Sequence, residues 1–279
     1  MTTTYNGIPL PSFIYGTAWK KEETARLVEL AVDSGFRAID TANQLKHYDE
    51  TRVGEALLAL QKKGIRREDL FLQTKFTSIG GQDDRLPYDP SAEPATQVRQ
   101  SFESSLKHLH TDVLDSYVLH GPTYRRGLAP EDWAVWGAME ELYRAGKTKM
   151  LGASNVSAEQ LALLCSKAAV KPMLVQNRCF AVMGWDYHVR ELCREHGIVY
   201  EGFSLLTANQ EFLGAPEIHA VARRVGAGVA QVIFRFSQQL GMIPLTGTTD
   251  AQHMKDDLYC ETFSLTPEEL QQIETIAVG

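Results

Sequence analysis

The sequence contains few cysteines, and their placement does not suit a metal site or a disulfide framework. Its 279 residues include four, none in a CxxC pair and none with a histidine at metal-ligand spacing: Cys165, Cys179, Cys193 and Cys260. Structural zinc sites use closely spaced pairs of cysteine and histidine. A chain of this length can also build a core without disulfides. The sequence therefore predicts neither a structural zinc site nor a disulfide-stapled fold.

Long apolar runs and clusters of basic residues are also missing. No stretch approaches the ~18 apolar residues that a membrane-spanning helix needs, and residues 1–6 lack the apolar core of a secretion signal. The formal net charge is −7, and no basic cluster is much longer than Arg66 with Arg67 or Arg125 with Arg126. These features argue against nucleic-acid and membrane partners, and they predict a cytoplasmic protein.

Two motifs of common enzyme classes are absent as well. Residues 15–19 read YGTAW, whereas doubly wound nucleotide-binding sheets carry GxGxxG after their first strand. Residues 152–155 read GASN and lack the second glycine of the GxSxG motif that holds a nucleophilic serine. These absences disfavour an open doubly wound sheet and a serine hydrolase.

What the sequence does contain is a regular alternation of short apolar runs and amphipathic stretches. Helical periodicity is clearest over residues 22–34 and 98–109, and Gly35 and Gly197 stand where helices should end. Eight strand–helix alternations predict parallel strands with right-handed crossovers, and eight such strands close a barrel. The runs predicted as strands are residues 13–17, 38–40, 70–76, 113–120, 149–155, 173–179, 199–204 and 242–247.

Two segments fall outside this repeat. Asn6 and Gly7, within residues 5–11, are typical of a hairpin turn, which we expect to cap the floor of the barrel. Residues 265–276 open with a helix-capping sequence and predict an additional C-terminal helix. Because the composition shows no break, residues 1–279 are predicted to form a single α/β domain, a (β/α)8 TIM barrel.

Polar residues gather at the predicted carboxyl ends of five strands. In a TIM barrel these ends form the rim that carries the chemistry. A strand-end aspartate often only caps a turn, and a lone histidine is more often structural, so the argument depends on their shared position. The residues are Asp40, Lys75, His120, Ser154 with Asn155, and Gln176 with Asn177.

Asp40 and Lys75 end adjacent predicted strands, so their side chains should meet. A buried lysine beside a carboxylate keeps its charge, because the ion pair offsets its desolvation. That cation can lower the pKa of a neighbouring phenol, which is ~10 without such help. An Asp–Lys–Tyr chain is thus a plausible proton donor to a developing alkoxide, and His120 is placed to orient a substrate carbonyl.

Four segments, in order along nearly the whole chain, resemble the aldo-keto reductase superfamily. They are similar to its second-strand, lysine, histidine and cofactor segments, and they read GFRAIDTA at 35–42, LFLQTK at 70–75, LDSYVLHGP at 114–122 and LGASN at 151–155. The resemblance implies a TIM-barrel enzyme that reduces aldehydes or ketones by hydride transfer from a nicotinamide cofactor. It also implies a catalytic tetrad of Asp40, a tyrosine, Lys75 and His120.

The tyrosine departs from the family pattern. The family places it five positions after the aspartate, where this chain has Leu45. Counting back from the DETRVG segment at 49–54 gives His47 instead, which indicates a two-residue insertion. Tyr48 is the tyrosine within reach and receives the role of general acid. His47 is the alternative donor, and a surface position for Tyr48 in an inactive protein is a further alternative.

The resemblance further implies where the cofactor binds. Ser154, Asn155 and Gln176 would contact the nicotinamide carboxamide, and Phe203 takes the place of the aromatic residue that stacks under the ring. The complete predicted set of cofactor-binding residues is Gly16, Thr17, Asp40, Ser154, Asn155, Gln176, Phe203, Ser204, Leu206, Thr246, Gly247, Thr248, His253 and Asp257.

The adenosine end of the cofactor site departs from the family too. The eighth-strand segment, IPLTGTT at 243–249, lacks the family's lysine, and the downstream arginine position corresponds to His253. Hydroxyls and backbone N–H groups can still hold phosphate, but Lys255 and His253 are the only obvious cations. NADPH is the predicted cofactor, with NADH possible and weaker selectivity than a bidentate arginine would provide.

The predicted partner is a small carbonyl substrate contacted by Trp19, His47 and His120, and Trp133 and Trp185 are further candidate pocket walls. The protein is expected to be a monomer or a weak homo-oligomer. Two alternatives remain open. The first is a non-catalytic regulatory subunit that binds nicotinamide nucleotides, and the second is a TIM-barrel lyase or isomerase in which Lys75 forms a Schiff base.

Overall fold

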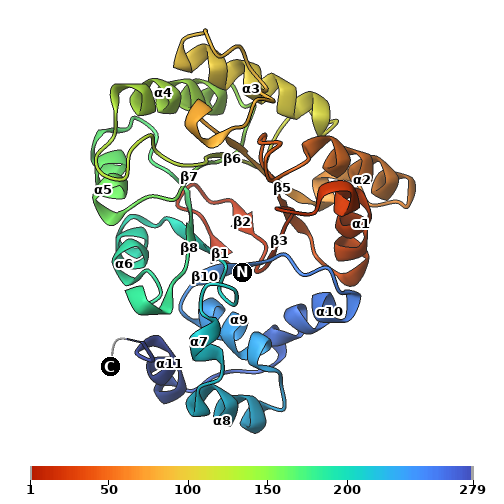
Figure 1. Cartoon of the computed structure of the whole chain (residues 1–279), viewed down its shortest axis with the longest axis vertical. Helices are drawn as coiled ribbons and strands as arrows, with labels where there is room; N and C mark the ends of the chain where they lie inside the picture. Colours follow the sequence, from red (N-terminus) through yellow and green to blue (C-terminus); the bar gives the residue numbers. More distant parts are fainter. Residues whose placement is uncertain (1, 278–279) are drawn as a thin grey trace.

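A closed barrel of parallel strands forms the centre of the protein (Figure 1), in a computed structural model that describes residues 2–277. Each predicted apolar run contains one barrel strand, so this part of the prediction is confirmed. The strands, in chain order, are β3 (Ile14–Gly16), β4 (Ala38–Asp40), β5 (Phe71–Phe76), β6 (Ser116–Leu119), β7 (Leu151–Ser154), β8 (Leu174–Arg178), β9 (Val199–Phe203) and β10 (Met242–Thr246). Neighbours pair in chain order, and β10 closes the barrel on β3.

Helices surround the barrel and connect its strands. They are α1 (Thr24–Ser34), α2 (Glu50–Lys62), α3 (Pro94–His108), α4 (Pro130–Arg144), α5 (Ala158–Lys167), α6 (Tyr187–His196), α7 (Gln210–Leu213), α8 (Pro216–Val225), α9 (Val229–Gln239), α10 (Ala251–Tyr259) and α11 (Pro267–Glu274). Short 3-10 segments are η1 (Lys21–Glu23), η2 (Arg67–Asp69), η3 (Ile79–Gly81), η4 (Ala181–Met183) and η5 (Cys260–Thr262). Over residues 2–277, none of the helices combines the length and apolarity required to cross a bilayer.

The two helices expected from periodicity are present with shifted starts. Helix α1 begins at Thr24 rather than residue 22, because η1 precedes it. Helix α3 begins at Pro94, four residues before the apolar pattern starts at Val98. A proline in the first turn suits a helix start, since its missing N–H has no partner there in any case. Gly35 and Gly197 follow α1 and α6 with positive φ angles of 122° and 66°.

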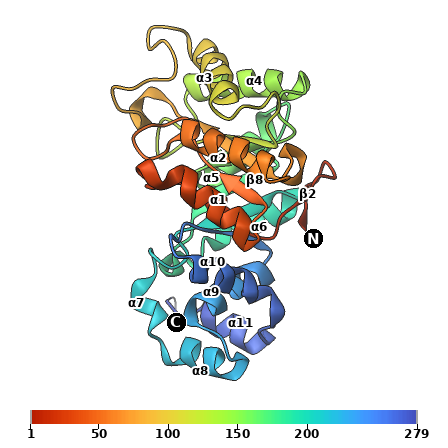
Figure 2. The ribbon, with the colours of Figure 1, turned by 90° about the vertical axis from the view of Figure 1, so that its right-hand side faces the viewer.

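Both additions to the barrel are confirmed. Strands β1 (Thr2–Thr3) and β2 (Pro9–Leu10) pair as an antiparallel hairpin, and Leu10 packs against apolar residues inside the barrel. Helix α11 starts with a capping box in which the side chain of Thr266 accepts from the backbone N–H of Glu269. This helix packs against α8 and α9, and Figure 2 shows α8 and α11 together at the end of the molecule away from α3 and α4.

The side chains of the barrel strands alternate between the helices and the barrel interior. In β5, Leu72 belongs to the large core beneath the helices, whereas Phe71 belongs to the apolar cluster inside the barrel. Residues two positions apart share a face, so Gln73 and Lys75 point inward as well. Phe71 therefore marks an apolar layer at the barrel floor, and a polar layer lies nearer the carboxyl ends of the strands.

Gly54 lies where α2 meets α3, and it leaves no room for a side chain. A Cβ there would be 1.9 Å from the carbonyl oxygen of His108, which is helix backbone and cannot move aside alone. We expect Gly54→Ala to destabilise the protein by about 1–3 kcal/mol or more, because the helices would have to separate. The midpoint of thermal unfolding measures this loss.

Gly137→Ala in α4 is the matched control. A Cβ at Gly137 would meet nothing within 4 Å, and alanine favours the helix by up to ~1 kcal/mol over glycine. The control should unfold at or above the wild-type temperature. Equal unfolding temperatures for the two variants would contradict the close approach of α2 and α3.

Candidate active site

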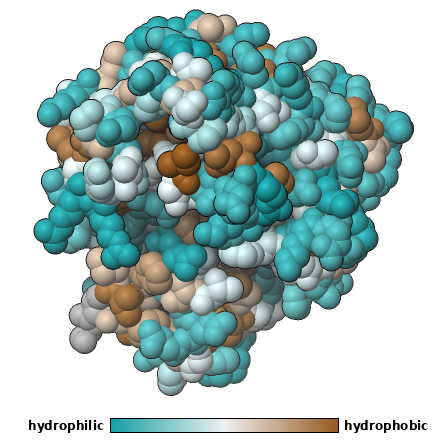
Figure 3. Space-filling model, turned by 45° about the horizontal axis from the view of Figure 1, so that its top comes forward, coloured by the Kyte–Doolittle hydropathy of each residue, from teal (hydrophilic) through white to brown (hydrophobic). Residues whose placement is uncertain are grey.

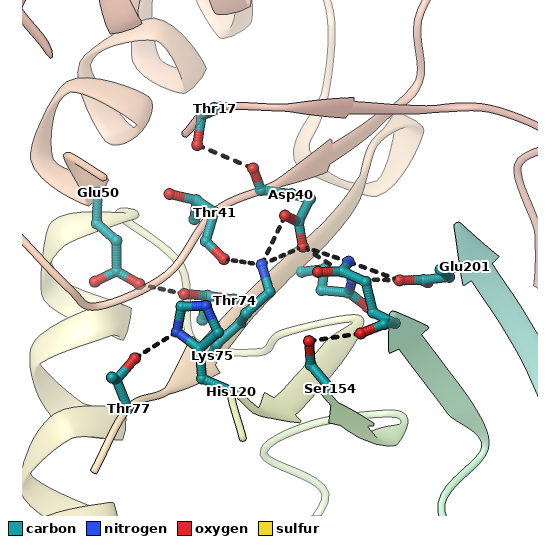
Figure 4. A network of polar contacts seen from close by, with 12 residues as sticks. Thr17, Asp40, Thr41, Glu50, Thr74, Lys75, Thr77, His120, Ser154 and Glu201 are labelled. Atoms are coloured by element: carbon teal, nitrogen blue, oxygen red, sulfur yellow. Dashed lines mark hydrogen bonds and ion pairs between the residues drawn. The ribbon is translucent and has the colours of Figure 1, made fainter. Parts of the chain in front are cut away.

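Asp40 and Lys75 form a buried ion pair inside the barrel (Figure 4). Asp40 is the last residue of β4, and Lys75 is the last but one of β5. The Nζ of Lys75 donates to both carboxylate oxygens of Asp40, at 2.6 and 2.7 Å, and to the carbonyl oxygen of Thr41 at 2.8 Å. Burial is the largest influence on the pKa of Lys75 and lowers it, but the charge and hydrogen bond of Asp40, together with Tyr48 and Glu201, outweigh burial, so the pKa lies above its ordinary value. Lys75 therefore keeps its charge, as predicted.

A second carboxyl group, Glu201 of β9, lies close to this pair. The Nε2 of Gln73 donates to Asp40 Oδ1 at 2.9 Å and to Glu201 Oε2 at 2.7 Å. The Nε2 of Gln176 donates to the same two oxygens, at 3.1 and 2.9 Å. Burial raises the pKa of Glu201 to about 7. Lys75 forms its ion pair with Asp40 and acts on Glu201 only through its charge, which lowers the pKa of that carboxyl group.

Tyr48 lies over the ion pair, at the end of the loop between β4 and α2. Its ring centroid is 5.1 Å from Lys75 Nζ and 5.8 Å from the ring of His120. The backbone N–H of Tyr48 donates to the carbonyl oxygen of Gln44 at 2.9 Å, which holds the loop in a tight turn. Leu45, at the family's tyrosine position, is 42% exposed. The loop between β4 and α2 thus brings Tyr48, and not Leu45, to the ion pair.

The acidity of Tyr48 differs from the expectation. Burial raises its pKa, the charge of Lys75 lowers it, and the charge of Asp40 raises it, with a net result above the ordinary value. The predicted effect of Lys75 is present, but desolvation of the phenolate outweighs it. Tyr48 is consequently protonated at neutral pH.

His120 follows β6 and sits beside Tyr48. Its Nδ1 is 2.6 Å from the hydroxyl oxygen of Thr77, a contact that Figure 4 shows next to the ion pair. Burial lowers the pKa of His120 to about 3, and the charge of Lys75 contributes in the same direction. The imidazole is therefore neutral, and it can act as a donor but not as a cation.

Most of the predicted site residues line one cavity of about 440 Å³, which we call the barrel-mouth cavity. They come from the ends of different strands, as the barrel architecture requires. The predicted residues that line it are Gly16, Trp19, Asp40, Tyr48, His120, Ser154, Asn155, Gln176, Phe203, Ser204, Leu206, Thr246, Gly247 and Thr248.

The other predicted residues lie outside this lining. Thr17 is fully buried, and its hydroxyl donates to the carbonyl oxygen of Asp40 at 2.9 Å. Lys75 lies beneath the cavity floor. His253 is exposed in the first turn of α10, and its backbone N–H donates to the capping side chain of Asp250. Asp257, on the same helix, is buried.

Three lining residues have a left-handed backbone although none is glycine. The φ angles are 63° at Trp19, 54° at Asn155 and 57° at Ser204. Asn155 and Ser204 directly follow β7 and β9. Such conformations cost about 1–3 kcal/mol in non-glycine residues and gather at functional sites. Their presence around a single cavity marks it as the candidate active site.

Lys20 is a cation in this cavity that the sequence analysis did not single out. It lines the cavity, and its Nζ donates to the carbonyl oxygen of Gly247. Burial lowers the pKa of Lys20. His253 and Lys255, the cations expected from the sequence, are both exposed and outside the lining. The only signal for Lys20 was its place directly after the first strand-end loop.

A second cavity of about 620 Å³, the side cavity, lies between the loops that follow β4, β5 and β6. His47 and His120 line it, and Asn155 and His120 are shared with the barrel-mouth cavity. Trp19 stacks on His47, with ring centroids 4.0 Å apart. In the space-filling view of Figure 3, apolar residues lie beside a hollow in a largely hydrophilic surface.

Two tryptophans proposed as pocket walls belong to the packed interior instead. Trp185 is fully buried against Phe236, and its Nε1 donates to the carbonyl oxygen of Ile273 at 3.0 Å. Trp133 packs against the core and lines neither cavity. The prediction that Trp185 forms a pocket wall is wrong, because this side chain packs against Phe236 of α9 and reaches Ile273 of α11.

The sequence matches a family model and known relatives over nearly its whole length. The model of the Aldo/keto reductase family matches residues 12–278. An uncharacterized oxidoreductase of Bacillus subtilis (strain 168), YtbE, is 31% identical over 277 residues, which are 98% of this chain and 91% of that protein. Glyoxal reductase of the same organism is 28% identical over 275 residues, again 98% of this chain and 91% of the relative.

Solved structures show the same architecture. An aldo/keto reductase from Brucella melitensis superposes with a TM-score of 0.84 at 26% identity, covering 99% of this chain and 98% of that one. MGS-M4, an aldo-keto reductase enzyme from a Medee basin deep-sea metagenome library, gives a TM-score of 0.86 at 22% identity, covering 100% and 96%. With a family model that spans nearly the whole chain and a relative above 30% identity over almost all of it, this protein belongs to the aldo/keto reductase family of oxidoreductases.

Proposed function

We propose that this protein reduces aldehydes or ketones to alcohols by hydride transfer, with NADPH as the cofactor and Tyr48 as the general acid. The observation that supports this most directly is the position of Tyr48, whose ring lies 5.1 Å from the charged Lys75 Nζ and faces His120 at the mouth of the barrel. The similarity to a glyoxal reductase supports an aldehyde as one class of substrate.

The residues of the barrel-mouth cavity suit a nicotinamide dinucleotide. At one end Phe203 offers an apolar ring face, and Ser154, Asn155 and Gln176 offer amide and hydroxyl groups for a carboxamide. At the other end Lys20 provides a charge for a phosphate group. The bound cofactor would supply the hydride, and the protein would supply orientation and a proton.

The proton path follows from the electrostatics of the site. Tyr48 is protonated at neutral pH, so its hydroxyl can give a proton to the oxygen of a carbonyl substrate. Lys75 stabilises the phenolate that remains, and Asp40 keeps Lys75 charged. Neutral His120 donates a hydrogen bond that holds the substrate oxygen near Tyr48.

Fluorescence titration with NADPH and NADH in parallel, followed by turnover of a panel of aldehydes and ketones, tests this proposal. We expect binding of both cofactors, tighter binding of NADPH, and oxidation of the bound cofactor when a carbonyl compound is added. Cofactor binding without turnover of any carbonyl compound would favour a regulatory subunit. Borohydride trapping of substrate on Lys75 would instead indicate a Schiff-base enzyme.

Lys20→Gln should weaken NADPH binding by about 10- to 100-fold, because a hydrogen bond to a charged group contributes ~1.5–3 kcal/mol. The titration above measures this change. Lys21→Gln is the matched control, since Lys21 is the exposed neighbour and lies outside the barrel-mouth cavity. The assignment fails when both variants bind NADPH equally.

We further propose that residues 1–279 form a single domain, that the protein is cytoplasmic, and that it is a monomer or a weak homo-oligomer. Sedimentation of the purified protein distinguishes a monomer from an oligomer.

A further inference from the structure

Thr77 is a buried residue that directly follows β5 and lines the side cavity. It is 4% exposed. Its backbone carbonyl oxygen accepts from the hydroxyl of Tyr88 at 2.8 Å and from Nε2 of Gln82 at 3.3 Å. These contacts hold the residue firmly, and its own hydroxyl oxygen lies 2.6 Å from Nδ1 of His120.

The available hydrogen-bond partners favour one direction for this contact. Within residues 2–277, Nδ1 of His120 is the only partner of the Thr77 hydroxyl. A hydroxyl group carries one hydrogen, whereas a neutral imidazole has one nitrogen that donates and one that accepts. If Nδ1 carried the hydrogen, the Thr77 hydroxyl would accept it, and its own hydrogen would have no protein acceptor and only the side cavity, which Thr77 lines, to face. If Thr77 donates to Nδ1, both groups are satisfied.

The other nitrogen of His120 faces the candidate active site. In the part of the chain that the structure describes, no protein group hydrogen-bonds Nε2. His120 lines both the barrel-mouth cavity and the side cavity, with Tyr48 beside it. A hydrogen on Nε2 is therefore free for a ligand where the two cavities meet.

We propose that Thr77 is a positioning residue: its hydroxyl donates to Nδ1 of His120 and thereby holds His120 in the tautomer that presents Nε2–H where the two cavities meet. The proposal rests on the proposed function, in which His120 donates a hydrogen bond to the substrate carbonyl oxygen. With the opposite tautomer, a lone pair of Nε2 would face that oxygen and repel it.

Two variants distinguish the effect of the Thr77 hydroxyl from the effect of the shape of the side chain. Thr77→Val keeps the branched shape and removes the donor, and Thr77→Ser keeps the donor. Nitrogen-15 NMR of histidine-labelled protein reports which ring nitrogen carries the hydrogen. The chain has eight histidines, so a His120→Asn variant assigns the signals of His120.

We expect wild type and Thr77→Ser to show a protonated Nε2 and an unprotonated Nδ1 near neutral pH. In Thr77→Val the signals should shift toward a mixture of tautomers, and kcat with an aldehyde should fall about 10-fold, the equivalent of one such hydrogen bond. The dissociation constant of NADPH should stay the same in both variants, because Thr77 does not line the barrel-mouth cavity.

The proposal is overturned when wild-type His120 carries its hydrogen on Nδ1, or when Thr77→Val retains the Nε2–H tautomer with full kcat. The wild-type spectrum decides the first point even when Thr77→Val does not fold. A protein that shows the Nε2–H tautomer and reduces no carbonyl compound would contradict the proposed function and leave the role of Thr77 intact.

Discussion

Replacing Tyr48 by phenylalanine should lower kcat with a generic aldehyde by about 10²- to 10⁴-fold, the range that a general acid contributes. The ring would stay over Lys75, whose Nζ lies 5.1 Å from its centroid, and only the hydroxyl would be lost. NADPH binding should remain nearly unchanged, since the cavity keeps its shape. Single-turnover kinetics and fluorescence titration measure the two quantities separately.

Two further variants show whether the fall of kcat in Tyr48→Phe results from the loss of a general acid. Tyr117→Phe changes a fully buried tyrosine that packs against Phe102 on the helix side of the barrel, and it should leave kcat unchanged. His47→Ala tests the alternative donor and should reduce kcat less than Tyr48→Phe. A native rate in Tyr48→Phe, or a larger loss of kcat in His47→Ala, would show that Tyr48 is not the general acid.

Lys75→Met should remove both activity and much of the stability of the fold. The substitution leaves the carboxylate of Asp40 buried without its cation, which destabilises a protein by about 3–5 kcal/mol. Tyr48 would also lose the one charge that lowers its pKa, so kcat should fall at least as far as in Tyr48→Phe. Urea unfolding and aldehyde turnover measure the two effects.

The double variant Lys75→Met with Asp40→Asn separates these effects. Asparagine keeps the shape of Asp40 and still accepts from Gln73 and Gln176, but it carries no charge. Most of the lost stability should return, and activity should not. Wild-type stability in the single variant, or restored turnover in the double variant, would contradict the assigned roles of this ion pair.

The barrel strands were predictable from the sequence because each is buried on both faces. A strand such as β10, Met242–Thr246, therefore appears as an apolar run with a polar residue only at its end. The first residues of the helices were harder to predict from the sequence. The first turn of α3 contains no large apolar residue and contributes no periodicity, so the pattern begins at Val98 although the helix begins at Pro94.

Within the candidate site, the residues that end strands could be predicted, and those that depend on a distant partner could not. In the sequence Lys20 does not differ from a surface lysine, because its hydrogen-bond partner Gly247 is distant along the chain and lies beside it only in the folded protein. Glu201 interrupts an apolar strand, and the two-residue alternation would have placed it inside the barrel beside Asp40. The acidity of Tyr48 depends on how the loop between β4 and α2 buries its ring, which no local pattern encodes.

The side chain of Gln176 is fixed in a way that limits what it can offer a ligand. Both hydrogens of its Nε2 are taken by Asp40 and Glu201, and an inverted amide would turn its oxygen toward the carboxyl oxygens of these two residues. Only the carbonyl oxygen remains for the barrel-mouth cavity. We expect a ligand with a primary amide to find an acceptor there, whereas the corresponding carboxylate has no hydrogen to donate and would place oxygen against oxygen. The expected preference for an amide over a carboxylate thus depends on a second carboxyl group, that of Glu201, which is itself fully buried.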